Sequence, residues 1–206
     1  MLIIGAKGHA KEILDVIGNN QNIMFFDDVS KDLPNLLFDK YKLITSIADA
    51  LELFKLDNSF ILGTGGCKIR RLLFEKFTAI GGMPISAISQ TAVIGTYDVV
   101  LGKAINIMHL CLISNNVKIG DGTLINARSN IHHDVEIGEF CEISPSSTIT
   151  GGVKIGDNTF IGSGSVVLPK LTIGIGVTIG AGSIITKNIP DNVLVYGNPG
   201  RIIKEI

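Results

Sequence analysis

The chain has 206 residues, of which 46% are hydrophobic, enough for one large buried core or two smaller ones. Lys and Arg number 18 and Asp and Glu number 19, so the net charge of -1 creates no field that would attract nucleic acid or an anionic membrane. The N-terminus lacks the features of a secretory signal, and no stretch has the length of a membrane span. We therefore expect a cytoplasmic protein without nucleic-acid or membrane partners.

The first part of the chain alternates between strand-like and helix-like segments. Apolar runs predict strands at residues 2–6, 22–28 and 58–65, and a shorter one near 84–88. Amphipathic stretches predict helices at residues 9–20, 48–55 and 67–77, with a loop after residue 28. This alternation predicts a small Rossmann-like βαβ domain with a parallel sheet over residues 1–87.

From Leu101 to Ile185 every sixth residue is aliphatic, and the residue two positions earlier is small or β-branched in most repeats. A period of six without helical spacing predicts a parallel β-helix, in which coil stacks on coil. The register slips by one residue near Tyr97, so we expect an irregular first coil. The repeats predict a prism from about residue 92 to 187 within a second domain at residues 88–206.

A glycine follows the aliphatic residue of every third repeat, which predicts three repeats for each coil. We expect this glycine to supply the positive φ of a tight corner. The tail after residue 187 leaves the register, and we expect it to add a strand and a short terminal helix that cap the prism. Two of the three cysteines, Cys111 and Cys141, occupy inward repeat positions and are expected to be buried.

Five motifs span the chain: IGAKGHAKEI, FFDD, FILGTGGCKIRR, IHHDVEIGEF and GNPGRII. Together they resemble the sialic-acid type of sugar O-acyltransferases, which includes bacterial N-acetyltransferases of UDP- and GDP-linked amino sugars. The resemblance implies a left-handed β-helix and a homotrimer, and we expect no metal because the cysteines lack metal-ligand spacing. It further implies acetyl-CoA as the acetyl donor and a nucleotide-linked amino sugar as the acceptor.

Acetyl transfer needs a base that removes a proton from the attacking group, and histidine has a suitable pKa. The resemblance implies that His133 is this base and that Asp134 orients it. His132, directly before it, could line the same cleft. The resemblance also places Asn126 in the cleft, where its amide could hold the acceptor or the thioester oxygen.

The donor side is implied by the resemblance alone. Many relatives have a donor-contacting histidine where this chain has Glu142, and a carboxylate cannot donate the same hydrogen bond unless it is protonated. Three small residues could let the pantetheine arm lie in a groove between two prisms: Gly151, Ser163 and Ala181. The alternative for these three is ordinary turn geometry.

The nucleotide end is predicted in the first domain. A loop between the first strand and helix could receive a phosphate on its amides: Gly5, Lys7, Gly8 and His9. Asp27 and Asp28 could accept hydrogen bonds from ribose or base, or simply form a turn, and Gly63 could allow close approach of the ligand. The spacing G-x-x-G-H lacks the full dinucleotide fingerprint, which argues against a redox cofactor.

Four other functions compete with this one, and the residues argue against the last two. The chain could acetylate oxygen on sialic acid or another sugar, or it could bind nucleotide sugars without turnover. A zinc hydratase would need His109, His132 and His133 to converge. A sugar nucleotidyltransferase would need a longer N-terminal domain with a different glycine-rich loop.

Overall fold

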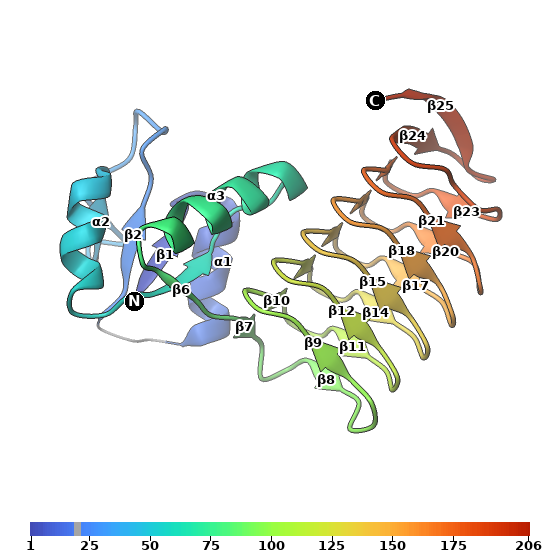
Figure 1. Cartoon of the computed structure of the whole chain (residues 1–206), viewed down its shortest axis with the longest axis horizontal. Helices are drawn as coiled ribbons and strands as arrows, with labels where there is room; N and C mark the ends of the chain where they lie inside the picture. The colour runs from blue at the N-terminus through green and yellow to red at the C-terminus, as the bar shows by residue number, and fades with distance from the viewer. Residues whose placement is uncertain (19–21) are drawn as a thin grey trace.

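The computed structural model describes residues 1–18 and 22–206, which form an N-terminal domain beside a prism of stacked coils (Figure 1). The predicted end of the first helix, at residues 19 and 20, lies outside the described residues. The elements of the N-terminal domain are β1 (Leu2–Ile4), α1 (Gly8–Ile17), β2 (Met24–Phe26), β3 (Leu36–Leu37), β4 (Tyr41–Ile44), α2 (Ile47–Phe54), β5 (Ser59–Leu62), α3 (Cys67–Ala79) and β6 (Met83–Pro84). The predicted α/β class is confirmed.

The N-terminal sheet has the strand order β3-β4-β2-β1-β5-β6, and only the β3–β4 pair is antiparallel. The hairpin of β3 and β4 lies where the sequence predicted a loop. Helix α1 buries Ala10, Ile13 and Val16, so a stripe with a spacing of three residues packs on the sheet. The Ser46 hydroxyl accepts a hydrogen bond from the Asp49 amide at 3.1 Å and caps α2.

The prism is a left-handed parallel β-helix with two-residue strands. Its strands are β7 (Ala87–Ile88), β8 (Val93–Ile94), β9 (Val100–Leu101), β10 (Asn106–Ile107), β11 (Leu112–Ile113), β12 (Lys118–Ile119), β13 (Leu124–Ile125), β14 (Asn130–Ile131), β15 (Glu136–Ile137), β16 (Glu142–Ile143), β17 (Thr148–Ile149), β18 (Lys154–Ile155), β19 (Phe160–Ile161), β20 (Val166–Val167), β21 (Thr172–Ile173), β22 (Thr178–Ile179) and β23 (Ile184–Ile185). The second residue of nearly every strand points into one continuous apolar core. Strand β7 already pairs with β10, so the pairing of the prism begins at Ala87.

Three sheets form the sides of the prism. We call the sheet that contains β10, β13 and β16 the domain face, because Ala87, Met108 and Leu124 share a core with Ile3 and Ile13 of the N-terminal domain. The sheet of β8, β11, β14, β17, β20 and β23 is the uncharged face. The sheet of β9, β12, β15, β18 and β21 is the charged face, because Lys118, Glu136 and Lys154 point outward from it.

The expected role of the recurrent corner glycine is wrong. Gly120 and its equivalents do not have positive φ; instead, a Cβ on Gly120 would lie 2.6 Å from the carbonyl carbon of Gly138 in the next coil. The glycine is needed for close stacking of coils. Positive φ occurs two residues later, at Gly122 and, in the following coils, at Phe140 and Asn158.

The predicted terminal helix is also wrong. Residues Arg201–Glu205 form strand β25, which pairs antiparallel with β24 (Val193–Tyr196) at the end of the domain face. The open end of a parallel β-helix exposes unpaired backbone groups, and a strand can satisfy them where a helix cannot.

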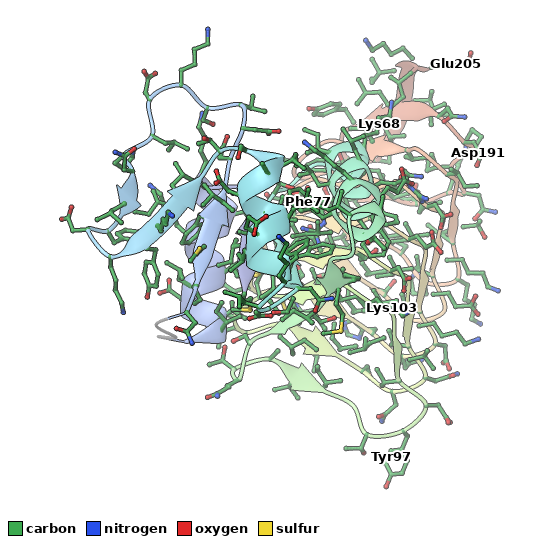
Figure 2. The ribbon with its side chains drawn as sticks, turned by 60° about the vertical axis from the view of Figure 1, so that its left-hand side comes forward. Lys68, Phe77, Tyr97, Lys103, Asp191 and Glu205 are labelled. Atoms are coloured by element: carbon green, nitrogen blue, oxygen red, sulfur yellow. The ribbon has the colours of Figure 1, made fainter. Side chains whose placement is uncertain are left out.

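Figure 2 shows Phe77 among the side chains of the N-terminal domain and Tyr97 projecting from the irregular first coil.

Buried polar groups fix the N-terminal domain to the prism. The fully buried guanidinium of Arg70 donates to the carbonyls of Leu62 and Thr64 on one side and of Gly122 and Ala104 on the other, at 2.7–3.4 Å. These hydrogen bonds cross the junction, so the two domains are held in one orientation.

His9 takes part in the same junction. Its Nε2 lies 3.0 Å from Nδ2 of Asn106, and that amide nitrogen also donates to the Leu62 carbonyl at 2.7 Å. Since an amide nitrogen only donates, Nε2 of His9 must be an unprotonated acceptor. Burial, followed by the nearby Arg70 charge, lowers the pKa of His9 from 6.5 to about 4.

This depressed pKa predicts a loss of stability in acid. The unfolded chain binds a proton at His9 below pH 6.5 and the folded chain does so only near pH 4, so the free energy of unfolding falls as pH drops through this window. The loss should reach about 3 kcal/mol. Urea unfolding at pH 7 and pH 4.5 should show a smaller fall in the free energy of unfolding for His9→Gln than for the native chain. The control His132→Gln should show the full fall. Equal dependence in His9→Gln and the native chain would contradict the assignment.

Candidate active site

His133 and Asp134 lie at the corner between the uncharged and charged faces, which we call the His133 corner. Nδ1 of His133 is 2.6 Å from Oδ2 of Asp134, and the two side chains are 66% and 53% exposed. Because the carboxylate occupies Nδ1, the proton of the neutral ring belongs there and Nε2 is left to accept a proton. The pair therefore has the geometry of a general base with an orienting acid.

Asp134 is itself held by a residue of the preceding coil. Nδ2 of Asn116 donates to Oδ1 of Asp134 at 2.6 Å, and the backbone of both residues has positive φ. The hydrogen bonds from His133 and then Asn116 lower the pKa of the Asp134 carboxyl, so it remains ionised. Sequence analysis missed Asn116, although a residue eighteen positions before Asp134 must stack on it in a three-repeat coil.

Gly151 lies in the coil that follows His133. A Cβ on Gly151 would be 2.6 Å from Cε1 and 2.7 Å from Nε2 of the His133 ring. The imidazole therefore rests directly on the Gly151 backbone. The prediction that Gly151 contacts the donor remains untested, but the residue has a contact with the candidate base in its own chain.

Asn126 lies at a different corner, between the domain face and the uncharged face, which we call the Asn126 corner. Ser163 and Ala181 follow at the same corner in later coils, and both are exposed. A groove of about 420 Å³ opens here, lined by His109, Leu110, Ala127, Arg128, Pro145 and Ser146. His133 and Gly151 therefore lie at one corner, on one side of the uncharged face. Asn126, Ser163 and Ala181 lie at the corner on its other side.

The nucleotide-end residues gather at the carboxyl edge of the N-terminal sheet. Gly5 follows β1, Asp27 follows β2 and Gly63 follows β5, and these three strands are neighbours. Ligands commonly bind at this edge of a parallel sheet. Lys7 and Gly8 are exposed at the start of α1, where the N-cap residue Lys7 makes no side-chain hydrogen bond to the helix.

Several of these predicted side chains have structural partners. Asp27 accepts hydrogen bonds from the amides of Val29 and Ser30 at 3.0 and 2.8 Å, and Asp28 pairs with Lys76 at 2.9 Å. The buried Gly63 packs against Ile3, whose Cγ2 would be 2.6 Å from an added Cβ. Their part in binding a nucleotide remains a prediction.

Glu142 lies at the domain junction. Its Oε2 accepts a hydrogen bond from the Gly66 amide at 2.7 Å, at the N-terminus of α3. Burial lowers the pKa of Arg70, and the charge of Glu142 partly offsets this by raising it. A carboxylate suits this place because it caps a helix and faces a buried guanidinium. The predicted donor contact of Glu142 is untested. Sequence analysis missed Arg70, although it shares a helical face with Cys67 and Phe77.

Two further properties bear on the alternatives. Among the described residues, no group of three His, Cys, Asp or Glu side chains could hold a metal ion. Within the same residues, no helix is both long and apolar enough to cross a bilayer.

Two protein families match the chain. Residues 1–77 match the PglD N-terminal domain, and residues 116–151 and 152–187 match the bacterial transferase hexapeptide family of six repeats. No match was found among curated proteins.

Solved structures match over almost the whole chain. A mutant of perosamine N-acetyltransferase from Caulobacter crescentus, in complex with CoA and GDP-perosamine, is 27% identical over 99% of this chain and 96% of that chain, with a TM-score of 0.88. The acetyltransferase domain of PglB from Neisseria gonorrhoeae, in complex with acetyl coenzyme A, is 28% identical over 98% of both chains, with a TM-score of 0.86. WeeI from Acinetobacter baumannii is 26% identical over 98% of both chains, with a TM-score of 0.89. Residues 1–77 therefore carry a PglD N-terminal domain, residues 116–187 carry bacterial transferase hexapeptide repeats, and the whole chain has the fold of solved sugar N-acetyltransferases.

Proposed function

We propose that this chain transfers an acetyl group from acetyl-CoA to the amino group of a nucleotide-linked amino sugar. The observation that carries the proposal is the His133–Asp134 pair, whose ring leaves Nε2 available. Support comes from full-length likeness to the Caulobacter enzyme in complex with CoA and GDP-perosamine, and from PglB in complex with acetyl coenzyme A.

The reaction proceeds by direct attack. The acceptor nitrogen forms a bond to the thioester carbonyl carbon, His133 Nε2 takes the proton from that nitrogen, and the carbon–sulfur bond breaks to release CoA. Asp134 stabilises the imidazolium that forms. The proton then passes from the imidazolium to the leaving thiolate, which regenerates the base.

A cysteine acyl-enzyme is not supported by the surroundings of the three cysteines. All three are free and buried. Burial raises the pKa of the thiol of Cys67 to about 11 and that of Cys141 to about 12, and it also raises that of Cys111. These thiols are protonated at neutral pH, and the thiol form is a poor nucleophile.

The faces of the prism support a homotrimer. The N-terminal domain covers the domain face, and outward Lys and Glu side chains keep the charged face in water. The outward residues of the uncharged face are Val93, Leu112, Asn130, Thr148, Val166 and Ile184. This column suits burial between copies.

A shared site follows from that packing. The His133 corner and the Asn126 corner border opposite sides of the uncharged face. If three copies turn this face toward a common axis, the His133 corner of one copy meets the Asn126 corner of the next. The groove between copies then brings the base close to the N-terminal domain of its neighbour. The roles of Ser163 and Ala181 toward the donor belong to this proposal, as do the two domains at 1–87 and 88–206, while a contact of Gly151 with the donor stays a prediction. The cytoplasmic location stays a prediction.

His133→Ala should lower turnover about a hundredfold or more, because the general base is lost. Acetyl-CoA consumption should be measured across UDP-, GDP- and dTDP-linked amino sugars, with sialic acid included to test O-acetylation. Lys154→Ala, on the charged face, is the control and should retain native turnover. Near-native turnover in His133→Ala would refute the assignment, and binding without turnover in the native chain would favour a non-catalytic binding protein.

Thr148→Glu should dissociate the trimer, because it places a carboxylate in each buried copy of the uncharged face. Thr172→Glu is a matched control, since it makes the same change on the charged face. Sedimentation should show a smaller species for Thr148→Glu and not for Thr172→Glu. Turnover should likewise be lost in Thr148→Glu alone. A trimeric, active Thr148→Glu variant would show that this face does not mediate assembly.

A further inference from the structure

The His133 corner brings three successive coils into contact around one imidazole. Asn116 belongs to the first coil, His133 and Asp134 to the second, and Gly151 to the third. Asn116 contacts Asp134 by a hydrogen bond of 2.6 Å, and Gly151 contacts the ring by direct packing. Residues eighteen positions apart in sequence are therefore neighbours in this column.

Asn116 controls the orientation of the Asp134 carboxylate. One carboxylate oxygen faces the histidine and the other receives the Asn116 amide, so both oxygens have a fixed partner. An exposed ion pair alone holds its geometry weakly, because water and side-chain freedom compete with it. The second hydrogen bond restricts rotation of the carboxylate and with it the ring.

Gly151 restricts the ring from the other side. Any larger residue would place its Cβ within 2.7 Å of ring atoms, closer than such contacts are found, so the ring would have to move. The φ of Gly151 lies outside the left-handed region, so an alanine would meet no backbone strain there. A larger residue at this position would therefore displace the exposed His133 ring and not the backbone.

Resting on the proposed function, we infer that Asn116 and Gly151 are positioning residues, which hold the imidazole of His133 from the coils on either side of it. Asn116 acts through Asp134 and keeps the ring proton on Nδ1. Gly151, which has no Cβ, leaves room for the ring atoms Cε1 and Nε2 beside its backbone. Neither residue needs to touch a substrate for this role, and a displacement of about 1 Å in a reacting group can lower turnover about a hundredfold.

Two substitutions test Asn116. Asn116→Gly removes the amide while accepting the positive φ of 54°, and Asn116→Asp replaces the donor by a like charge that faces Asp134. We expect kcat to fall about tenfold or more with Asn116→Gly and further with Asn116→Asp, with KM for both substrates unchanged. Asn192→Asp is the matched control, because Asn192 also has positive φ and lies at another corner.

Gly151 is tested by a double-mutant cycle. Gly151→Ala should lower kcat without raising KM for acetyl-CoA, and it should have no further effect on turnover in the His133→Ala background. If Gly151 instead acts by contacting the donor, KM for acetyl-CoA will rise and the loss will persist in that background. Either of these results would overturn the inference for Gly151.

Nitrogen NMR of the His133 ring provides a readout that does not depend on turnover. The native chain should show a single neutral tautomer with the proton on Nδ1, and Asn116→Asp should show a mixture of tautomers. Native turnover and an unchanged tautomer in both Asn116 variants would refute the inference while leaving the proposed function in place. Absence of turnover in the native chain, with the tautomer shift observed, would refute the function and retain the positioning.

Discussion

The stacking of coils every eighteen residues is the constraint on which the rest of the structure depends. Aliphatic side chains at every sixth position can be buried together only if each coil repeats the shape of the one before it. This requirement places the corners in straight columns. Close contact between successive coils then selects glycine where a Cβ would strike a neighbouring coil, the next one at Gly120 and the preceding one at Gly151.

The same columns give an exposed surface pair, His133 and Asp134, additional contacts that order it. His133 and Asp134 are both exposed in the single chain, and their own contact would hold them loosely. Neighbouring coils add Asn116 on one side and Gly151 on the other. Three prism faces with different chemistry then define where other groups can approach: one carries the N-terminal domain, one carries charges, and one is uncharged. The candidate base borders the third.

The periodic features could be predicted from sequence, because each repeat carries its own signal. This holds for the β-helix and for the three helices of the first domain, whereas the roles of His133 and Asp134 were implied by the family resemblance alone. Features that depend on contacts between distant segments could not be predicted. Arg70 and Glu142 come together only when the domains dock, and Asp28 pairs with Lys76, 48 positions away in the chain. Asp27 instead forms a local turn with Val29 and Ser30, the alternative that the sequence left open. The terminal strand depends on β24, a pairing that the short segment at 201–205 does not encode alone.

We propose that one active site is built from two neighbouring copies, and subunit mixing tests this arrangement most directly. His133→Ala removes the base from one side of the groove, and Ser163→Trp blocks the other side from the Asn126 corner. Each variant alone should be inactive. When the two are dissociated, mixed and reassembled, the account predicts that acetyl transfer returns, because some grooves then combine two native halves. Activity no greater than the sum of the separate variants, in oligomers shown to be mixed, would contradict a shared site.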